Sequence, residues 1–124
     1  MKPDTRNWLD MSEYDVATAT PGLKMIIQRF RTELENMGIH CEQILLFGSQ
    51  ATGSASEGSD IDLFVVSPDW ARSNDRERLE MPGIAAARIL EPVQARGATP
   101  EEIAMHRLPP LWEQVLNEQA IVVA

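Results

Sequence analysis

Two short apolar segments separated by a loop of small residues constrain the fold of this chain more than any other feature. Residues 44–47 (ILLF) and 61–66 (IDLFVV) are dominated by large apolar side chains, as is typical of strands that are covered on both faces. Residues 48–59 between them contain three glycines and four serines. We therefore expect two buried strands joined by a turn whose backbone a ligand can approach closely.

Helical patterns flank the two strands and predict an α/β (α+β) domain with a small mixed sheet of about four strands. The clearest helix covers residues 21–37, because its apolar side chains fall on one stripe and Gly38 suits its end. A capping box formed by Thr99 and Glu102 marks the start of a later helix. The other expected elements are a solvated helix at 69–83 broken near Pro82, a short helix at 84–90, a third strand at 91–96, a last helix from 109 to about 117, and a terminal strand at 120–123.

Length and composition indicate a soluble single-domain protein. Its 124 residues suffice for one domain, 44% of them are hydrophobic, and the one cysteine, Cys41, excludes an internal disulfide. No apolar run approaches the roughly 18 residues that a membrane span needs, so we expect a cytoplasmic protein without a membrane partner. A net charge of -8 repels phosphate backbones, and only 6% of the residues are aromatic, so a nucleic-acid template is not expected either.

Asp60 and Asp62 are the strongest candidates for a metal site. They are two residues apart at the start of the second strand, so both carboxylates are expected on one face, with Cα atoms roughly 7 Å apart. Carboxylates held in this way suit hard cations such as Mg²⁺. Without a cation, such neighbours repel each other and raise each other's pKa values.

Gly48 and Ser49 supply a complementary anion site. A glycine directly after a buried strand allows a tight turn. If residues 49–52 start a helix, the backbone amides of its first turn, together with the Ser49 hydroxyl, suit phosphate. Phosphates at this turn and a cation at Asp60 and Asp62 would lie at adjacent strand ends. Metal-assisted nucleotidyl transfer uses such an arrangement, because Mg²⁺ bridges triphosphate oxygens and stabilises charge on the transferred phosphorus.

The segment FGSQATGSASEGSDIDLFVV resembles the signature of the DNA polymerase β-like nucleotidyltransferase superfamily, in which Gly-Ser is followed after ten residues by Asp-x-Asp. The order of the elements is similar to that of its minimal nucleotidyltransferase branch, which includes antitoxin-like proteins. The resemblance implies the polymerase β-like fold, with an N-terminal extension at residues 1–21 and the nucleotidyltransferase domain at residues 22–124.

The resemblance also implies roles for individual residues. Gly48 and Ser49 would bind the nucleoside triphosphate. Ser59 is a further candidate for nucleotide binding, although it also suits a turn or a cap. Asp60 and Asp62 would be the catalytic ligands of Mg²⁺.

A third carboxylate on a later strand completes the metal site or activates the acceptor in such proteins. Glu91 is our choice for this catalytic and metal-binding position, because it begins the expected third strand. Gln94 is the alternative, and glutamine cannot act as a base. The family often has arginine where this chain has Gln50 and Thr52, which weakens the expected grip on phosphate.

The reaction implied by the resemblance is Mg²⁺-dependent transfer of a nucleoside monophosphate, with ATP as the expected donor, to an acceptor hydroxyl. The acceptor is expected on a partner protein such as a HEPN-type ribonuclease toxin, which this chain would modify or sheathe as an antitoxin. Two alternatives stay open: a small-molecule nucleotidyltransferase of the aminoglycoside-modifying type, and a catalytically silent nucleotide-binding or interaction module. The sequence also leaves open whether the chain forms a homo-oligomer.

Overall fold

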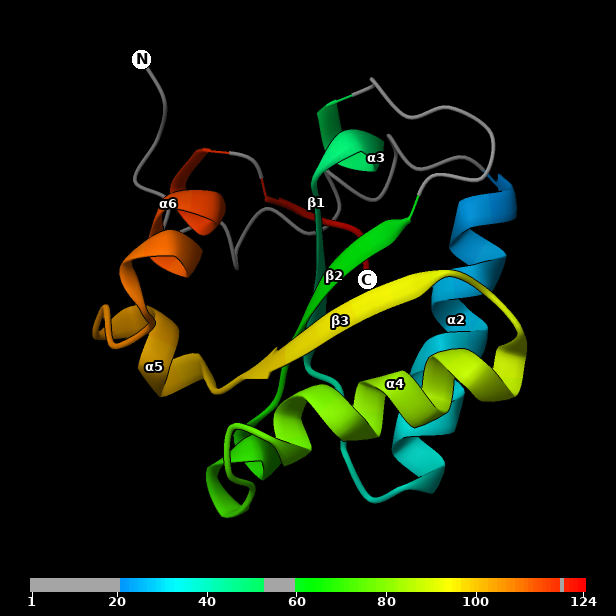
Figure 1. Cartoon of the computed structure of the whole chain (residues 1–124), viewed down its shortest axis with the longest axis horizontal. Coiled ribbons are helices and arrows are strands. Elements are labelled where there is room, and N and C mark those ends of the chain that lie inside the picture. The colour runs from blue at the N-terminus through cyan, green and yellow to red at the C-terminus, as the bar shows by residue number, and fades with distance from the viewer. Residues whose placement is uncertain (1–20, 53–59, 119) are drawn as a thin grey trace.

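A computed structural model describes residues 21–52, 60–118 and 120–124 (Figure 1). Ser59 and residues 1–20 of the expected N-terminal extension lie outside these ranges. Within them, no helix is both long enough and apolar enough to cross a bilayer. The elements are α2 (Pro21–Asn36), β1 (Gln43–Phe47), α3 (Ser49–Thr52), β2 (Ile61–Val66), the 3-10 helix η2 (Pro68–Arg72), α4 (Glu77–Ile89), β3 (Val93–Ala98), α5 (Pro100–Ala104), α6 (Pro110–Glu118) and β4 (Ile121–Val122).

The strands form one mixed sheet in the order β3-β2-β1-β4, which confirms the expected fold class. β1 runs antiparallel to both β2 and β4, whereas β2 and β3 are parallel. The register places Phe47 beside Asp62, and Asp62 beside Gln94. These three residues therefore form one row across the sheet.

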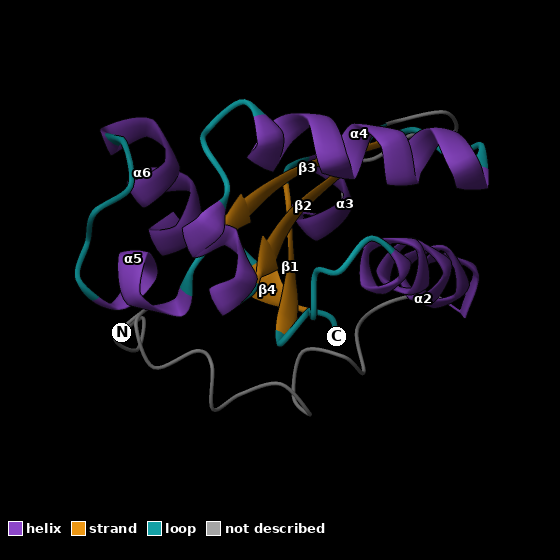
Figure 2. Cartoon of the chain, turned by 90° about the horizontal axis from the view of Figure 1, so that it is seen from below, coloured by secondary structure: helices purple, strands orange, loops and turns teal. Residues whose placement is uncertain are grey.

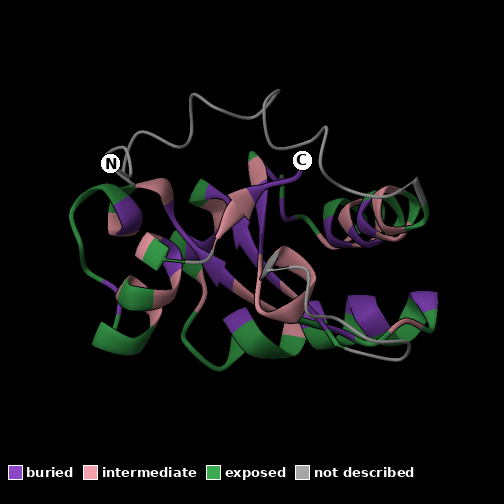
Figure 3. Ribbon diagram, turned by 90° about the horizontal axis from the view of Figure 1, so that it is seen from above, coloured by how far each residue is buried: buried purple, intermediate pink, exposed green. Residues whose placement is uncertain are grey.

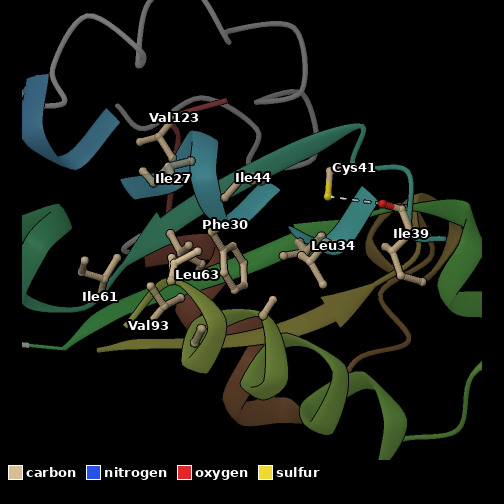
Figure 4. Close-up of a cluster of buried hydrophobic side chains, with 14 of the residues drawn as sticks. Ile27, Phe30, Leu34, Ile39, Cys41, Ile44, Ile61, Leu63, Val93 and Val123 are labelled. Atoms are coloured by element: carbon tan, nitrogen blue, oxygen red, sulfur yellow. Dashed lines mark hydrogen bonds between the residues drawn. The ribbon is translucent and has the colours of Figure 1, made fainter. Parts of the chain in front are cut away.

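Helices α2 and α4 cover one face of the sheet (Figure 2). The main hydrophobic core lies between this face and the two helices, and alternate residues of each strand point into it (Figure 4). Its members include Ile27, Phe30 and Leu34 of α2, Ile44 and Leu46 of β1, Ile61, Leu63 and Val65 of β2, and Ala85, Ala86 and Ile89 of α4. Cys41 is buried in this core, as expected of a small apolar residue.

Helices α5 and α6 lie against the opposite face of the sheet (Figure 2). A smaller core forms there, and the burial colours show the strands buried between the two helical layers (Figure 3). It contains Leu45, Phe64, Val66, Ala98, Ile103 and Leu116, among others. Asp62 shares this face with Phe64 but is only half-buried, and Gln94 beside it is exposed.

Gly38 ends α2 as the sequence predicts. It has a φ of +91°, its N–H donates to the carbonyl of Glu35 at 3.0 Å, and the N–H of Ile39 donates to the carbonyl of Leu34 at 3.0 Å. These two bonds form a Schellman motif, which needs a left-handed residue and therefore favours glycine.

The expected helix break at Pro82 was wrong, because α4 continues through it from Glu77 to Ile89. Proline cannot donate a backbone hydrogen bond inside a helix, but Pro82 is buried on the same side as Ala85, Ala86 and Ile89. Their burial against the sheet holds the helix together despite the missing bond. The third strand, expected at 91–96, runs instead from Val93 to Ala98.

A partly buried ion pair joins α4 to the start of α5. The predicted capping box is present, since Glu102 N–H donates to Thr99 Oγ1 at 3.1 Å and Thr99 N–H donates to Glu102 Oε1 at 2.8 Å. Arg78, with 7% of its surface exposed, donates to the same carboxylate and to the carbonyl of Trp70. Burial raises the pKa of Glu102, but the hydrogen bonds from Thr99 and Arg78 outweigh it and leave this pKa below its ordinary value.

We expect Glu102→Gln to destabilise the domain by roughly 1–3 kcal/mol near pH 7, because glutamine keeps the capping box but loses the charge that Arg78 meets. A carboxyl whose pKa is lowered by folding adds stability above its unfolded pKa, which is 4.5 for Glu102, and loses that contribution as the pH falls below it. Urea unfolding should therefore show the difference between wild type and variant shrinking from pH 6 to pH 3.

The matched control is Glu101→Gln, since Glu101 is an exposed neighbour that pairs with Arg107 on the surface. Its effect should stay within about 0.5 kcal/mol at every pH. A pH-independent loss in Glu102→Gln would contradict the role given to the Arg78 pair.

Candidate functional site

The two aspartates lie where β2 begins. Asp60 directly precedes the strand and is exposed, while Asp62 lies within it and is half-buried. Burial and the nearby Asp60 carboxylate both raise the pKa of Asp62. The two acidic groups are therefore close enough to repel each other, as the sequence predicts.

Gly48 places the turn after β1 directly against Asp62. Its φ is +71°, and a Cβ added there would lie 2.3 Å from Asp62 Oδ2. Both the left-handed backbone and the missing side chain are therefore needed at this position. Ser49 begins the short helix α3 immediately afterwards. The structure thus brings the Gly-Ser turn and the acidic pair together.

The structure does not bring Glu91 to this pair. Glu91 precedes β3, and its carboxylate lies 4.0 Å from Arg29 Nη1 of α2, on the side of the main core. The neighbour of Asp62 on β3 is Gln94, whose Nε2 donates to Asp60 Oδ2 at 3.0 Å. Because β3 begins two residues later than expected, a neutral amide takes the position that we had given to a third carboxylate.

The donor set of Asp60 and Asp62 fits one hard cation. In the part of the chain that the structure describes, no three Asp, Glu, His or Cys side chains gather around a common point. Mg²⁺, however, is commonly held by one or two carboxylates, with water and substrate phosphates as its other ligands. A cation would also relieve the repulsion that raises the pKa of Asp62.

A cavity of about 150 Å³ opens beside Asp62 on the same face of the sheet. It is lined by Phe47, Asp62, Leu79, Gln94, Ala95, Arg96 and Trp112. The sequence analysis gave neither Arg96 nor Trp112 a functional role. Arg96 could have been found from the sequence, because it follows Gln94 by two residues on the same strand and therefore lies on the same face of the sheet. The position of Trp112 depends on how α6 packs, which no local pattern reveals.

Two larger cavities, of about 410 Å³ each, lie away from the acidic pair. One, near Arg31 and His40, lies beyond the opposite end of β1. The other lies between α2 and α4, where Arg88 is paired with Glu33. Neither is lined by Asp60, Asp62 or Gly48, so among these three cavities of the described residues it is the smaller one that adjoins the candidate site.

The chain is similar to proteins that share this arrangement of elements. The family model described as the nucleotidyltransferase domain matches residues 23–104. A crystal structure of a toxin–antitoxin with AMP-PNP is similar at 20% identity and a TM-score of 0.55, covering 82% of this chain and 72% of that one.

A second similar structure is a candidate nucleotidyltransferase from Sulfolobus solfataricus. It has 18% identity and a TM-score of 0.52, and the match covers 98% of this chain and 87% of that one. At these identities the structural likeness shows the fold. No curated protein sequence matches the chain.

We expect Gly48→Ala to lower the affinity for Mn²⁺, used as a probe of the acidic pair, by about tenfold or more, because the new methyl group displaces the Asp62 carboxylate. Gly38→Ala is the matched control. Gly38 also has a positive φ, but nothing lies within 4 Å of its added Cβ.

Both variants should lose roughly 1–2 kcal/mol of stability from the left-handed backbone, and only Gly48→Ala should lose the cation. Calorimetric titration and urea unfolding separate the two effects. Equal Mn²⁺ affinity in the two variants would show that Asp62 does not hold the cation at this turn.

Proposed function

The chain belongs to the nucleotidyltransferase domain family, and from that premise we propose that it transfers AMP from ATP to the hydroxyl of an acceptor. The observation that carries this proposal is the contact between the Gly48 turn and the Asp62 carboxylate. It brings a group suited to phosphate and a group suited to a cation to one point of the sheet.

In this reaction the acceptor oxygen attacks the α-phosphorus of ATP. A bond forms between that oxygen and the phosphorus, and the bond from the α-phosphorus to the bridging oxygen of the β-phosphate breaks. The products are the adenylylated acceptor, pyrophosphate and the proton lost by the hydroxyl. Charge builds up on the phosphoryl oxygens and the leaving pyrophosphate, so positive groups accelerate the reaction.

Asp60 and Asp62 are the residues that would hold Mg²⁺. When bound, Mg²⁺ supplies positive charge to the triphosphate and so favours the departure of pyrophosphate. Asp62 lies half-buried between Phe47 and Gln94 in the sheet, which fixes its direction. Asp60, at the exposed end of the strand, is oriented by the amide of Gln94.

Gly48 and Ser49 would bind the phosphates that leave. The backbone at Gly48 lies directly against the Asp62 carboxylate, and a phosphate there would be close to a cation held by Asp62. The amide and hydroxyl of Ser49 are donors suited to phosphate oxygens. This chain has Gln50 where a charged residue would strengthen that grip, so the cation carries more of the attraction.

ATP is the proposed donor because AMP-PNP, an ATP analogue, is present in the similar toxin–antitoxin structure. The same similarity supports a toxin–antitoxin role, in which the acceptor hydroxyl belongs to a partner protein. A HEPN-type toxin is the partner that the sequence resemblance indicates. The chain would act there as the antitoxin.

We expect the double variant Asp60→Asn/Asp62→Asn to lose Mg²⁺-dependent binding of AMP-PNP by about tenfold or more, since both carboxylates that hold the cation become neutral. Isothermal titration with and without Mg²⁺ measures the effect. Glu91→Gln serves as the control, because Glu91 pairs with Arg29 and should not alter the affinity beyond about twofold. Unchanged Mg²⁺-dependent binding in the double variant would refute the site.

Gln94 favours a second candidate function, in which the chain binds the nucleotide and its partner but transfers AMP poorly. A glutamine amide cannot accept the hydroxyl proton, whereas a positioned carboxylate contributes about 10²–10⁴-fold as a general base. With an amide at position 94, the described residues place two carboxylates at the site, those of Asp60 and Asp62, and no third one.

We expect Gln94→Glu, which keeps the shape of the side chain, to raise the transfer of labelled AMP by about tenfold or more if the missing base limits the reaction. The assay uses α-labelled ATP, Mg²⁺ and a HEPN-type toxin, the proposed partner, as acceptor. Rapid transfer by the wild type with no gain in Gln94→Glu would rule out the second candidate. Nucleotide binding with label transfer only in the variant would support it.

A further inference from the structure

We propose that the 150 Å³ cavity beside Asp62 is the acceptor subsite, and that Arg96 in its wall binds an anionic group of the acceptor. The inference rests on the proposed function for the direction of the reaction. It adds a chemical class to the acceptor: an alcohol that carries a negative charge, separated from its hydroxyl by an apolar body.

The sheet register places the cavity and the Gly48 turn on different sides of Asp62. Phe47, Asp62 and Gln94 form one row, and Gly48 follows Phe47 beyond that row. Arg96 lies two residues further along β3, beside Phe64 in the next row of the same face. Seen from Asp62, the Gly48 turn therefore lies on the β1 side, at the end of the sheet. Arg96 lies on the β3 side, one row closer to the middle of the sheet.

This placement matches the direction of an in-line displacement. In phosphoryl transfer the attacking and leaving oxygens are roughly in line, on opposite sides of the phosphorus. If pyrophosphate leaves toward Gly48 and Ser49, the acceptor hydroxyl approaches from the side of the cavity. The cavity includes the Asp62 carboxylate in its wall, so an acceptor seated there reaches the reacting phosphorus.

Arg96 is distinguished by having no carboxylate partner among the described side chains. Among the residues that the structure describes, every other arginine lies within 4.0 Å of an acidic side chain. Its Nε is buried and has no hydrogen-bond partner there. An anion bound in the cavity would give the guanidinium the charged partner that no described carboxylate supplies.

Aromatic contacts hold the guanidinium in the wall of the cavity. Its Cζ lies 5.7 Å from the ring centroid of Trp112, in a cation–π contact. Trp112 in turn makes edge-to-face contacts with Phe47 and Phe64, at centroid distances of 5.9 and 5.3 Å. Arg96 therefore presents a positive charge next to a rigid apolar surface.

The charges in the cavity also set the orientation of its ligand. Asp62 repels an anion at one end, and Arg96 attracts it at the other. The walls between them include the apolar side chains of Phe47, Leu79 and Trp112. An anion paired with Arg96 would thus leave the hydroxyl of the same molecule directed toward Asp62.

Phenyl phosphate tests the subsite, because it combines an apolar ring with an anion and is small. It is titrated by calorimetry into the full chain saturated with Mg²⁺ and AMP-PNP, so that the nucleotide blocks the triphosphate site. We expect binding to the nucleotide-loaded protein, weakened at least about tenfold in Arg96→Gln and largely kept in Arg96→Lys, which retains the charge. Benzyl alcohol, the neutral counterpart, should not distinguish these proteins.

Arg88→Gln is the matched control, since Arg88 lies on α4 away from the cavity and pairs with Glu33. It should bind phenyl phosphate like the wild type. The subsite is overturned if phenyl phosphate fails to bind the loaded protein, or if Arg96→Gln binds it as tightly as the wild type. A selective loss of AMP-PNP affinity in Arg96→Gln would instead show that the Arg96 guanidinium binds the nucleotide. That result would also overturn the acceptor subsite.

The proposed function and the subsite can fail separately. If the wild type does not bind AMP-PNP with Mg²⁺, the proposed function fails. Phenyl phosphate titrated without nucleotide, compared between wild type and Arg96→Gln, then still decides whether Arg96 holds an anion.

Discussion

The close approach of the Gly48 backbone to the Asp62 carboxylate is the constraint on which the site depends. It requires that β1 and β2 pair with Phe47 opposite Asp62, and both strands are held in that register by burial on two faces. A shift by one residue would turn Asp62 toward the main core and place an apolar side chain at the turn. The two hydrophobic cores therefore fix the chemistry of the site as well as the fold.

The parts of the fold that depend on local pattern could be predicted from the sequence. Gly38 and the Thr99 capping box are read from a few neighbouring residues, and both are present in the structure. Pro82 was misjudged because its effect on the helix depends on what the helix packs against. Local patterns describe the chain before it folds, whereas burial decides which of them persist.

The third position of the site shows the same limit. Whether Glu91 or Gln94 meets the acidic pair depends on the parallel register of β3 against β2, which is a contact between strands far apart in the sequence. The sequence alone could narrow the choice to two residues three positions apart. The residues that line the cavity were harder still to predict. Arg96 and Trp112 belong to different elements, and only the packing of α6 against the sheet brings them together.

The distribution of charge explains why an anion site in this chain would need an arginine that no described carboxylate neutralises. With a net charge of -8, the surface as a whole repels phosphorylated or carboxylated substrates, and the other described arginines are neutralised by acidic neighbours. An anionic ligand therefore needs a local cation that is not already paired. Arg96 meets that need only because Trp112, rather than a carboxylate, lies against its guanidinium.

Gln94 and Arg96 together change what the site demands of its acceptor. With an amide beside Asp60, no carboxylate at that position takes the hydroxyl proton, so the reaction depends more on how acidic the hydroxyl is and how well it is placed. Placement can offset a missing base, because holding two reacting groups in the right geometry can remove about 7–11 kcal/mol from the barrier of a bimolecular reaction. The rigid aromatic side chains around the single positive charge of Arg96 would hold an anionic acceptor in one orientation. On this account the chain relies on holding its acceptor rather than on deprotonating it.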